Sequence, residues 1–345
     1  MRAAVLRAYR APLSLETVAD PVCEPDGVVL KTLACGICRS DWHGWVGEHP
    51  KVKPGDIPGH EYCGEVVAAG PLAKWKAGDR VIAPFILACG DCPECRSGQT
   101  TTCRAQRVPG FGDRGAYAEY VSVPHAHNLT RLPDSLSPAL AAGLGCRVTT
   151  AFHALTGRAA LQAGEWLAVH GTGGVGLSLL LIGKALGARV IVVDVVPEKL
   201  AHALSLGAEA ALDARDGDVA ARIVDLTQGG AHVSVEALGI EATANASLRC
   251  LRPLGRHVQV GLPVGHTARM QIDMNTLYMR QLSVFGTRGM PAWRYPTLLS
   301  LIETGKLDVT PIVARTVALS QATEELRAFD GPTAPGVAVI TDFAG

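Results

Sequence analysis

The feature that most constrains the fold of this chain is a glycine-rich turn at residues 171–176, which reads Gly-Thr-Gly-Gly-Val-Gly. An apolar, strand-like segment, 166–170, precedes it, and a helix-like segment, 177–188, follows it. In this context a G-x-G-x-x-G turn is typical of dinucleotide-binding folds, because the glycines let the backbone approach a pyrophosphate at the helix N-terminus. We therefore predict that a dinucleotide lies against Gly171, Gly173, Gly174, Val175 and Gly176.

Asp194 indicates which dinucleotide binds. It ends the next apolar segment, 189–194, where an acidic residue can accept hydrogen bonds from the adenosine ribose hydroxyls. The same carboxylate would repel the additional phosphate of NADP, and no arginine follows it directly. The sequence therefore favours NAD(H) as the cofactor.

The order of the segments predicts two domains. At 345 residues the chain exceeds the usual size of a single domain. Residues 1 to about 147 contain short apolar runs broken by glycine and proline, which is typical of a mostly β domain. From residue 166, strands alternate with helices, which predicts a parallel sheet covered on both faces. From about residue 286 the chain is expected to leave that sheet, with 336–343 as a last β segment.

Charge and hydropathy exclude several kinds of partner. Lys+Arg and Asp+Glu both number 32, so the chain has no net charge that would attract nucleic acid or an anionic membrane surface. A small, weakly charged substrate fits better. Residues 1–15 carry three arginines and do not resemble a secretory signal, and no segment has the roughly 20 apolar residues of a membrane span. We therefore expect a soluble, cytoplasmic protein.

Four of the ten cysteines form a compact motif, C-x2-C-x2-C-x7-C. Because the cytosol keeps thiols reduced, such a cluster indicates metal binding rather than disulfides. Four thiolates can surround one tetrahedral zinc ion and leave no open position, so this lobe, at about 89–103, is predicted to be structural. An iron–sulfur cluster and four unliganded thiols are the alternatives. The predicted ligands are Cys89, Cys92, Cys95 and Cys103.

Further motifs make the whole chain resemble a known family. Residues 59–64 read Gly-His-Glu-Tyr-Cys-Gly and are followed by Gly70, residues 38–43 read Cys-Arg-Ser-Asp-Trp-His, and residues 144–146 read Leu-Gly-Cys. Together with the four-cysteine lobe, these motifs resemble the zinc-containing medium-chain dehydrogenase/reductase family, alcohol dehydrogenase type. The resemblance implies an α/β protein with two domains. A GroES-like, mostly-β catalytic domain would span 1–147 and 286–345, and a Rossmann domain with a doubly wound parallel sheet would span 148–285.

The resemblance also implies a second, catalytic zinc. Cys38, His60 and Cys146 would be its protein ligands, which leaves one position open for water or substrate. Related polyol dehydrogenases usually place a carboxylate at the third position, so a cysteine there favours a simple alcohol. Glu61 would lie behind the metal and could enter its shell, and Asp41 would accept the ring N–H of His60.

The remaining roles also come from the resemblance. Ser40 would hydrogen-bond the substrate oxygen and pass its proton to His43, whereas the residues alone would suggest a turn hydroxyl and an exposed imidazole. The family places a basic residue against the cofactor pyrophosphate, and here that residue is Arg39. Many relatives supply a second arginine in a Gly-Arg pair near the C-terminus, and here that pair is Gly336-Val337. Lys199 could equally be a solvated surface charge. The further cofactor contacts implied are Arg39, Thr150, Lys199, Val260 and Gly261.

The expected substrate is a hydrophobic alcohol. Alignment to the family places His49, Phe85 and Leu262 along the alcohol pocket, although each could be ordinary packing. We therefore expect an NAD-dependent oxidation of a primary or secondary alcohol to an aldehyde or ketone. The alternatives are a polyol or amino-alcohol dehydrogenase and, in another class, a non-catalytic zinc-binding or redox-sensing protein. The family further suggests a homo-oligomer, a tetramer rather than a dimer, with two zinc ions per chain.

Overall fold

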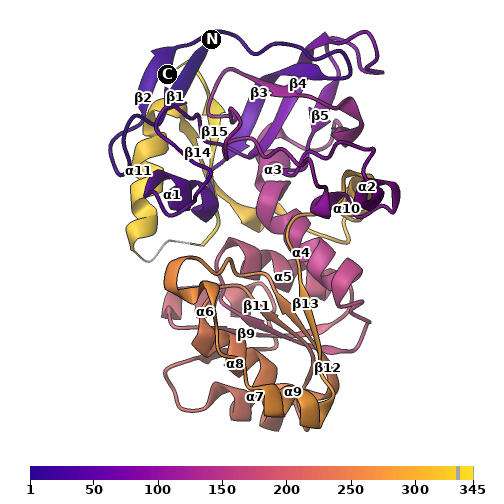
Figure 1. Ribbon diagram of the computed structural model, residues 1–345. Coiled ribbons are helices and arrows are strands. Elements are labelled where there is room, and N and C mark those ends of the chain that lie inside the picture. Colours follow the sequence, from indigo (N-terminus) through magenta and orange to yellow (C-terminus); the bar gives the residue numbers. More distant parts are fainter. Residues whose placement is uncertain (332–334, 345) are drawn as a thin grey trace.

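The chain folds into two lobes, each built on its own sheet (Figure 1). The computed structural model describes residues 1–331 and 335–344. Both termini lie in the upper lobe of Figure 1, the middle of the chain forms the lower lobe, and the C-terminal part returns to the upper one. Among the described residues, no helix is both long and apolar enough to cross a membrane.

The upper lobe is mostly β. Its larger sheet has the strand order β14-β15-β3-β4-β5-β7, with β6 also paired to β3. All pairs are antiparallel except β14 with β15. The strands are β3 (Val28–Gly36), β4 (Glu61–Ala69), β5 (Arg80–Ile82), β6 (Tyr120–Val123), β7 (Thr130–Arg131), β14 (Val313–Ala318) and β15 (Val337–Asp342), and a separate pair joins β1 (Arg2–Val5) to β2 (Ser14–Thr17). Its helices are α1 (Arg39–Trp45), α2 (Pro93–Arg96), α3 (Pro138–Gly143), α10 (Tyr295–Glu303) and α11 (Ala322–Arg327).

The lower lobe is a parallel sheet with the strand order β10-β9-β8-β11-β12-β13. The order runs outward in both directions from β8, which is the doubly wound arrangement with helices on both faces. This confirms the predicted fold class. The strands are β8 (Trp166–His170), β9 (Arg189–Asp194), β10 (Ala210–Asp213), β11 (Ala231–Glu236), β12 (Leu251–Gln259) and β13 (Ser283–Gly286). The helices are α5 (Gly174–Ala185), α6 (Pro197–Ser205), α7 (Val219–Thr227), α8 (Glu241–Arg249) and α9 (Met274–Arg280).

One helical stretch, residues 138–158, joins the lobes without a break. It contains α3, a π-helical turn at Leu144–Val148, α4 (Thr149–His153) and a second π-helical turn at Ala154–Arg158. π-helical turns are frequent at functional sites because they reorient side chains within a helix. The first turn carries Cys146 to the junction of the lobes. The domain limits expected at 147/148 and 285/286 stay predictions.

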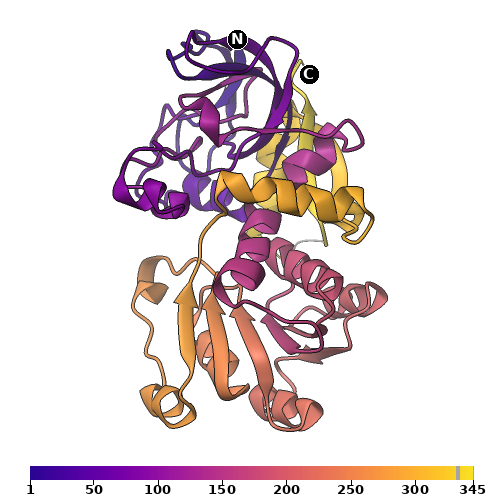
Figure 2. The same cartoon turned by 90° about the vertical axis from the view of Figure 1, so that its right-hand side faces the viewer.

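A continuous apolar core holds the lobes together. A single cluster of buried side chains includes Cys63 and Ile82 of the upper lobe, Phe152 of the connecting helix, and Val169 and Leu179 of the lower lobe. Figure 2 shows α10 lengthwise between the lobes, where its Tyr295 and Leu298 join the same cluster. Residues from both lobes can therefore form one site at this junction.

Candidate functional site

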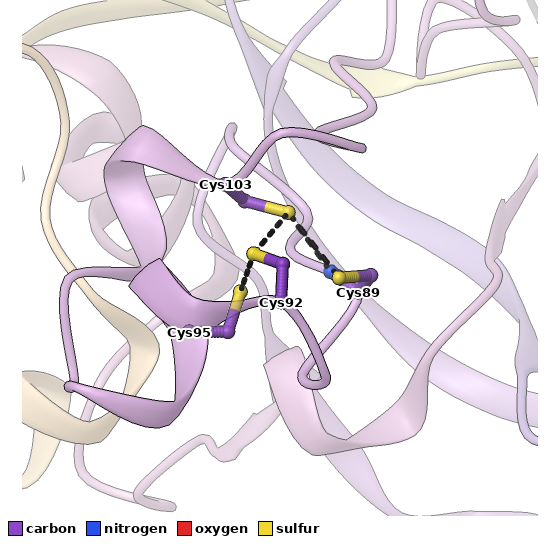
Figure 3. Close-up of side chains that lie close together, drawn as sticks. All are labelled: Cys89, Cys92, Cys95 and Cys103. Atoms are coloured by element: carbon purple, nitrogen blue, oxygen red, sulfur yellow. Dashed lines mark hydrogen bonds between the residues drawn. The ribbon is translucent and has the colours of Figure 1, made fainter.

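The four-cysteine lobe brings its sulfur atoms together (Figure 3). Cys92 precedes α2, with Pro93 opening the helix, so that Cys95 follows one turn later. The Sγ–Sγ separations are 3.4 Å for Cys92–Cys95, 3.9 Å for Cys92–Cys103 and 3.5 Å for Cys89–Cys103. A tetrahedron with Zn–S bonds of about 2.3 Å has edges of about 3.8 Å. The four thiols therefore fit one zinc ion.

The backbone around this lobe favours a thiolate. The N–H groups of Asp91 and Cys92 point at the sulfur of Cys89 and lower its pKa to about 6. In contrast, burial raises the pKa of Cys95 to about 12. Metal ions bind the thiolate form, so at least one ligand is already available near neutral pH. The side chains that hold the loop include Asn128, which accepts from Ala88 N at 2.9 Å and donates to Ala88 O at 3.0 Å.

A second cluster lies at the junction of the lobes. Cys38 precedes α1, His60 precedes β4, Glu61 begins β4, and Cys146 lies in the first π-helical turn. These residues each offer one ligand atom, and all four atoms lie within 4.8 Å of one another. The Nε2 atom of His60 is buried and has no hydrogen-bond partner. Two thiols and a free imidazole nitrogen are ligands that suit zinc.

Asp41 fixes the orientation of His60. Its Oδ1 lies 2.9 Å from His60 Nδ1 and accepts from Gly59 N at 3.2 Å. Its Oδ2 accepts from Cys38 N at 2.9 Å and from the Tyr117 hydroxyl at 3.3 Å. A proton on Nδ1 is therefore held by the carboxylate, which leaves Nε2 free to bind a metal ion.

The glycine-rich turn is built as its sequence predicts. Gly171 has φ +95°, a left-handed conformation that favours glycine. A Cβ on Gly176 would stand 1.8 Å from Gly171 O, so only glycine allows the first turn of α5 to pack against the loop. Nearby, Asp194 Oδ2 accepts from Thr172 N and Thr172 Oγ1, both at 2.7 Å. Burial tends to raise the pKa of Asp194, but these hydrogen bonds lower it below its usual value. The carboxylate therefore stays ionised at the end of β9.

Comparison with known proteins agrees with this geometry. Residues 24–134 match the alcohol dehydrogenase GroES-like domain family, and residues 174–304 match the zinc-binding dehydrogenase family. An alcohol dehydrogenase of Geobacillus stearothermophilus is 37% identical over 266 residues, which are 76% of this chain and 78% of that protein. The chain belongs to the zinc-containing medium-chain dehydrogenase/reductase family, alcohol dehydrogenase type. It is therefore an NAD-dependent oxidoreductase that acts on CH–OH groups.

Two further relatives show how much of the dehydrogenase resembles other members of the family. The structure of the alcohol dehydrogenase TADH from Thermus sp. ATN1 matches it with a TM-score of 0.92 at 31% identity, covering 99% of this chain and 100% of that one. A D-arabitol-phosphate dehydrogenase of Enterococcus avium is 31% identical over 320 residues, 90% of this chain and 88% of that protein. The likeness therefore covers both lobes and includes relatives with different named substrates.

Glu61 and Arg147 form a buried ion pair behind the metal ligands of the dehydrogenase. Glu61 is fully buried, and its Oε1 accepts from Cys146 N at 3.0 Å. Its Oε2 lies 3.1 Å from Arg147 Nη2, which also donates to Ile37 O at 3.1 Å. Burial raises the pKa of Glu61, and the Arg147 guanidinium opposes that rise and favours the ionised carboxylate. Sequence reasoning missed Arg147, although its place directly after a ligand cysteine was visible.

Aromatic rings lie beside His60. Its ring centroid is 5.7 Å from that of Phe85 and 5.1 Å from that of Phe111, and the ring of His49 lies 4.6 Å from Phe111. Burial lowers the pKa of His49, which favours the neutral imidazole. Phe111 was not among the expected residues. The structure thus gathers His49 and Phe85 near His60, whereas Leu262 lies against the backbone of Gly239 on the lower lobe and is 45% exposed.

The two residues that were expected to pass the substrate proton toward solvent follow Cys38. Ser40 Oγ lies 3.8 Å from Cys38 Sγ. His43 Nδ1 lies 2.7 Å from Glu48 Oε2, and 15% of the His43 side chain is exposed. Ser40 therefore lies beside the ligand Cys38, whereas the His43 ring is partly exposed, and the proton-transfer roles of both residues stay predictions.

The other expected cofactor residues lie on both lobes. Thr150 Oγ1 is buried and accepts from Gly289 N at 3.1 Å. After β12, the N–H groups of Val260 and Gly261 donate to Glu236 O at 2.9 and 2.8 Å. Lys199 lies in α6, where its charge contributes to the lowered pKa of Asp194. Arg39 is exposed and lies 4.9 Å from the ring centroid of Trp42.

Proposed function

We propose that this dehydrogenase reversibly transfers hydride between a primary or secondary, hydrophobic alcohol and NAD, giving the aldehyde or ketone. The observation that carries the proposal is the unpartnered, buried Nε2 of His60, which lies with two cysteine sulfurs at the junction with the dinucleotide-binding lobe. We further propose two zinc ions per chain, one held by the four-cysteine lobe and one by Cys38, His60 and Cys146.

In this proposal each residue of the open site has a separate task. When bound, zinc supplies Lewis-acid chemistry that acidifies the alcohol O–H. Ser40 hydrogen-bonds the substrate oxygen, and His43 carries the proton toward solvent with support from Glu48. Asp41 holds His60 in place, and Phe85 and Phe111 keep water away from the reacting carbon. Glu61, paired with Arg147, supports the ligands from behind.

The preference for NAD rests on Asp194. Its carboxylate is ionised and lies beside the glycine-rich turn, where it can accept hydrogen bonds from ribose hydroxyls. A phosphate on that ribose would meet a like charge, and the following residue, Val195, is apolar. We expect NADP to be used much less efficiently than NAD, and a comparison of kcat/KM for the two cofactors tests this.

A polyol derivative is the second candidate substrate, and Arg288 favours it. Its guanidinium carbon lies 5.5 Å from the ring centroid of Phe85, and the side chain donates to Gln106 at 2.7 Å. Within the described residues it forms no ion pair with an acid, so it could bind a hydroxyl-rich or phosphorylated substrate. NADH formation with primary, secondary, aromatic and polyhydroxy alcohols separates the two candidates. If only polyols were oxidised, the proposal that the substrate is a hydrophobic alcohol would be refuted.

We also propose a cytoplasmic homo-oligomer, a tetramer rather than a dimer, joined through the nucleotide-binding sheets. β13 is the last strand of the parallel sheet, and Val284 on it is 48% exposed. Tyr278 and Met279 on the neighbouring α9 are 76% and 67% exposed. An unpaired strand edge beside apolar side chains is a suitable surface for a second copy. Light scattering coupled to size-exclusion chromatography measures the oligomeric state. A monomer would refute the proposed homo-oligomer.

A further inference from the structure

Arg147 lies between the two halves of the candidate site. It follows the ligand Cys146 in the first π-helical turn, and only 4% of it is exposed. At one end its guanidinium pairs with Glu61, as described above. At the other, its Cδ and Nε lie against the dinucleotide loop, since a Cβ on Gly174 would stand 2.9 Å from each. Gly174 is the first residue of α5. The side chain therefore reaches from the metal site to the N-terminus of the dinucleotide-binding helix.

One donor of this side chain is unused. Nη2 lies 3.1 Å from Glu61 Oε2 in an ion pair and donates to Ile37 O, and the Cys38 sulfur also faces the guanidinium, but Nη1 is buried and has no hydrogen-bond partner. Buried polar atoms are normally paired, so an unpaired guanidinium nitrogen beside a helix N-terminus indicates an acceptor that is supplied from outside the chain. An anion suits that place, because the guanidinium charge and the free N–H groups of the first helical turn both favour it.

The chain lacks the second pyrophosphate arginine that the family resemblance places near the C-terminus. Val337 occupies that position in β15, is 6% exposed and packs in the apolar core. Arg39, the expected first contact with the pyrophosphate, lies in α1 and forms no ion pair within the described part of the chain. Arg147 is a cation that reaches the junction from the connecting helix, next to the dinucleotide loop.

We propose that Arg147 binds the pyrophosphate of the dinucleotide at the N-terminus of α5 while keeping Glu61 in place behind the metal ligands. This inference rests on the proposed function. Arg147 would then be a cofactor-binding and positioning residue that links the occupancy of the dinucleotide loop to the geometry of the metal site. It would also explain how the chain retains a second phosphate contact with Val337 in place of arginine.

The test compares cofactor binding in two variants that differ only at Arg147. Glu61→Gln keeps the arginine and an amide acceptor for it, and the double variant Glu61→Gln/Arg147→Gln removes the arginine without leaving a buried carboxylate unpaired. Dissociation constants for NADH and for ADP-ribose are measured by fluorescence titration and calorimetry. We expect the double variant to bind both ligands about 10- to 100-fold more weakly than Glu61→Gln does.

Two controls keep the outcome unambiguous. Arg256→Gln removes a partly buried arginine of the lower lobe that pairs with Glu165, and it should leave both dissociation constants unchanged. Zinc content is measured in every variant, so that loss of metal is recognised separately from loss of cofactor binding. Equal binding of ADP-ribose by Glu61→Gln and by the double variant would overturn the inference. If the parent protein itself bound neither NADH nor zinc, the proposed function would fail instead.

Discussion

Replacing Asp41 by asparagine tests how the open metal site is organised. The carboxylate, 3% exposed, has donors on both oxygens: Gly59 N and the ring N–H of His60 on Oδ1, and Cys38 N and the Tyr117 hydroxyl on Oδ2. In asparagine, one of the two carboxylate oxygens is replaced by an NH2 group, which cannot accept from the two donors that face it. The Tyr117 hydroxyl can turn and accept, but Cys38 N then loses its acceptor. One unsatisfied buried donor costs about 1–3 kcal/mol of folding free energy.

The larger effect of Asp41→Asn should be on zinc. Without the negative charge, His60 loses the partner that keeps the proton on Nδ1, and loss of such a partner weakens metal binding about 10- to 100-fold. Zinc affinity of the open site is measured by competition with a chelator, and the free energy of unfolding by urea titration. Tyr117→Phe is the matched control, because it removes one donor to Asp41 and leaves the contact with His60. An Asp41→Asn protein that binds zinc within about twofold of the parent would refute this reasoning.

Three other perturbations give distinct outcomes. Gly176→Ala would place a Cβ 1.8 Å from Gly171 O and should abolish cofactor binding and lower the melting temperature, whereas Gly173→Ala, with nothing within 4 Å, should fold normally; equal stability of the two would contradict this. Burial lowers the pKa of His170 to about 3 and that of His257 to about 4, so the unfolded chain binds more protons below its own histidine pKa. Each neutral buried histidine therefore stabilises the fold above about pH 6.5, and this contribution is lost as the pH drops toward 4, by about 2 kcal/mol per histidine between pH 7.5 and 5. Urea titrations should find this loss about 2 kcal/mol smaller in His257→Gln than in the parent. Cys92→Ser should remove one zinc per chain and lower thermal stability while the open site keeps its metal, and metal analysis that still finds two zinc ions would exclude the four-cysteine site.

Structural features that are built from neighbouring residues could be predicted from the sequence. The turn at 171–176 and the following helix involve contiguous residues, so spacing alone predicted both the loop and the place of Asp194. Alternating strands and helices predicted a parallel sheet covered on both faces, but not the strand order β10-β9-β8-β11-β12-β13. The four-cysteine lobe was equally local, since its ligands lie within one short loop and the helix α2.

The open site depends on long-range packing. Cys38, His60 and Cys146 lie before a helix, before a strand and in a π-helical turn, so only the resemblance to a family joined them in advance. Arg147 was missed because an arginine in a helical segment usually remains solvated, and its burial arises only when the connecting helix docks against both lobes. Leu262 lies on the lower lobe and is 45% exposed, and its place in the alcohol pocket stays a prediction.

The central claim is that Cys38, His60 and Cys146 hold a zinc ion required for NAD-linked alcohol oxidation. The most direct measurement removes the metal and follows NADH formation from a secondary alcohol as zinc is returned, in the parent protein and in Cys146→Ala. We predict that activity of the parent returns with the zinc that fills the open site, and that Cys146→Ala keeps the four-cysteine zinc and binds NADH but stays inactive. Full activity of either protein without metal in the open site would contradict the claim.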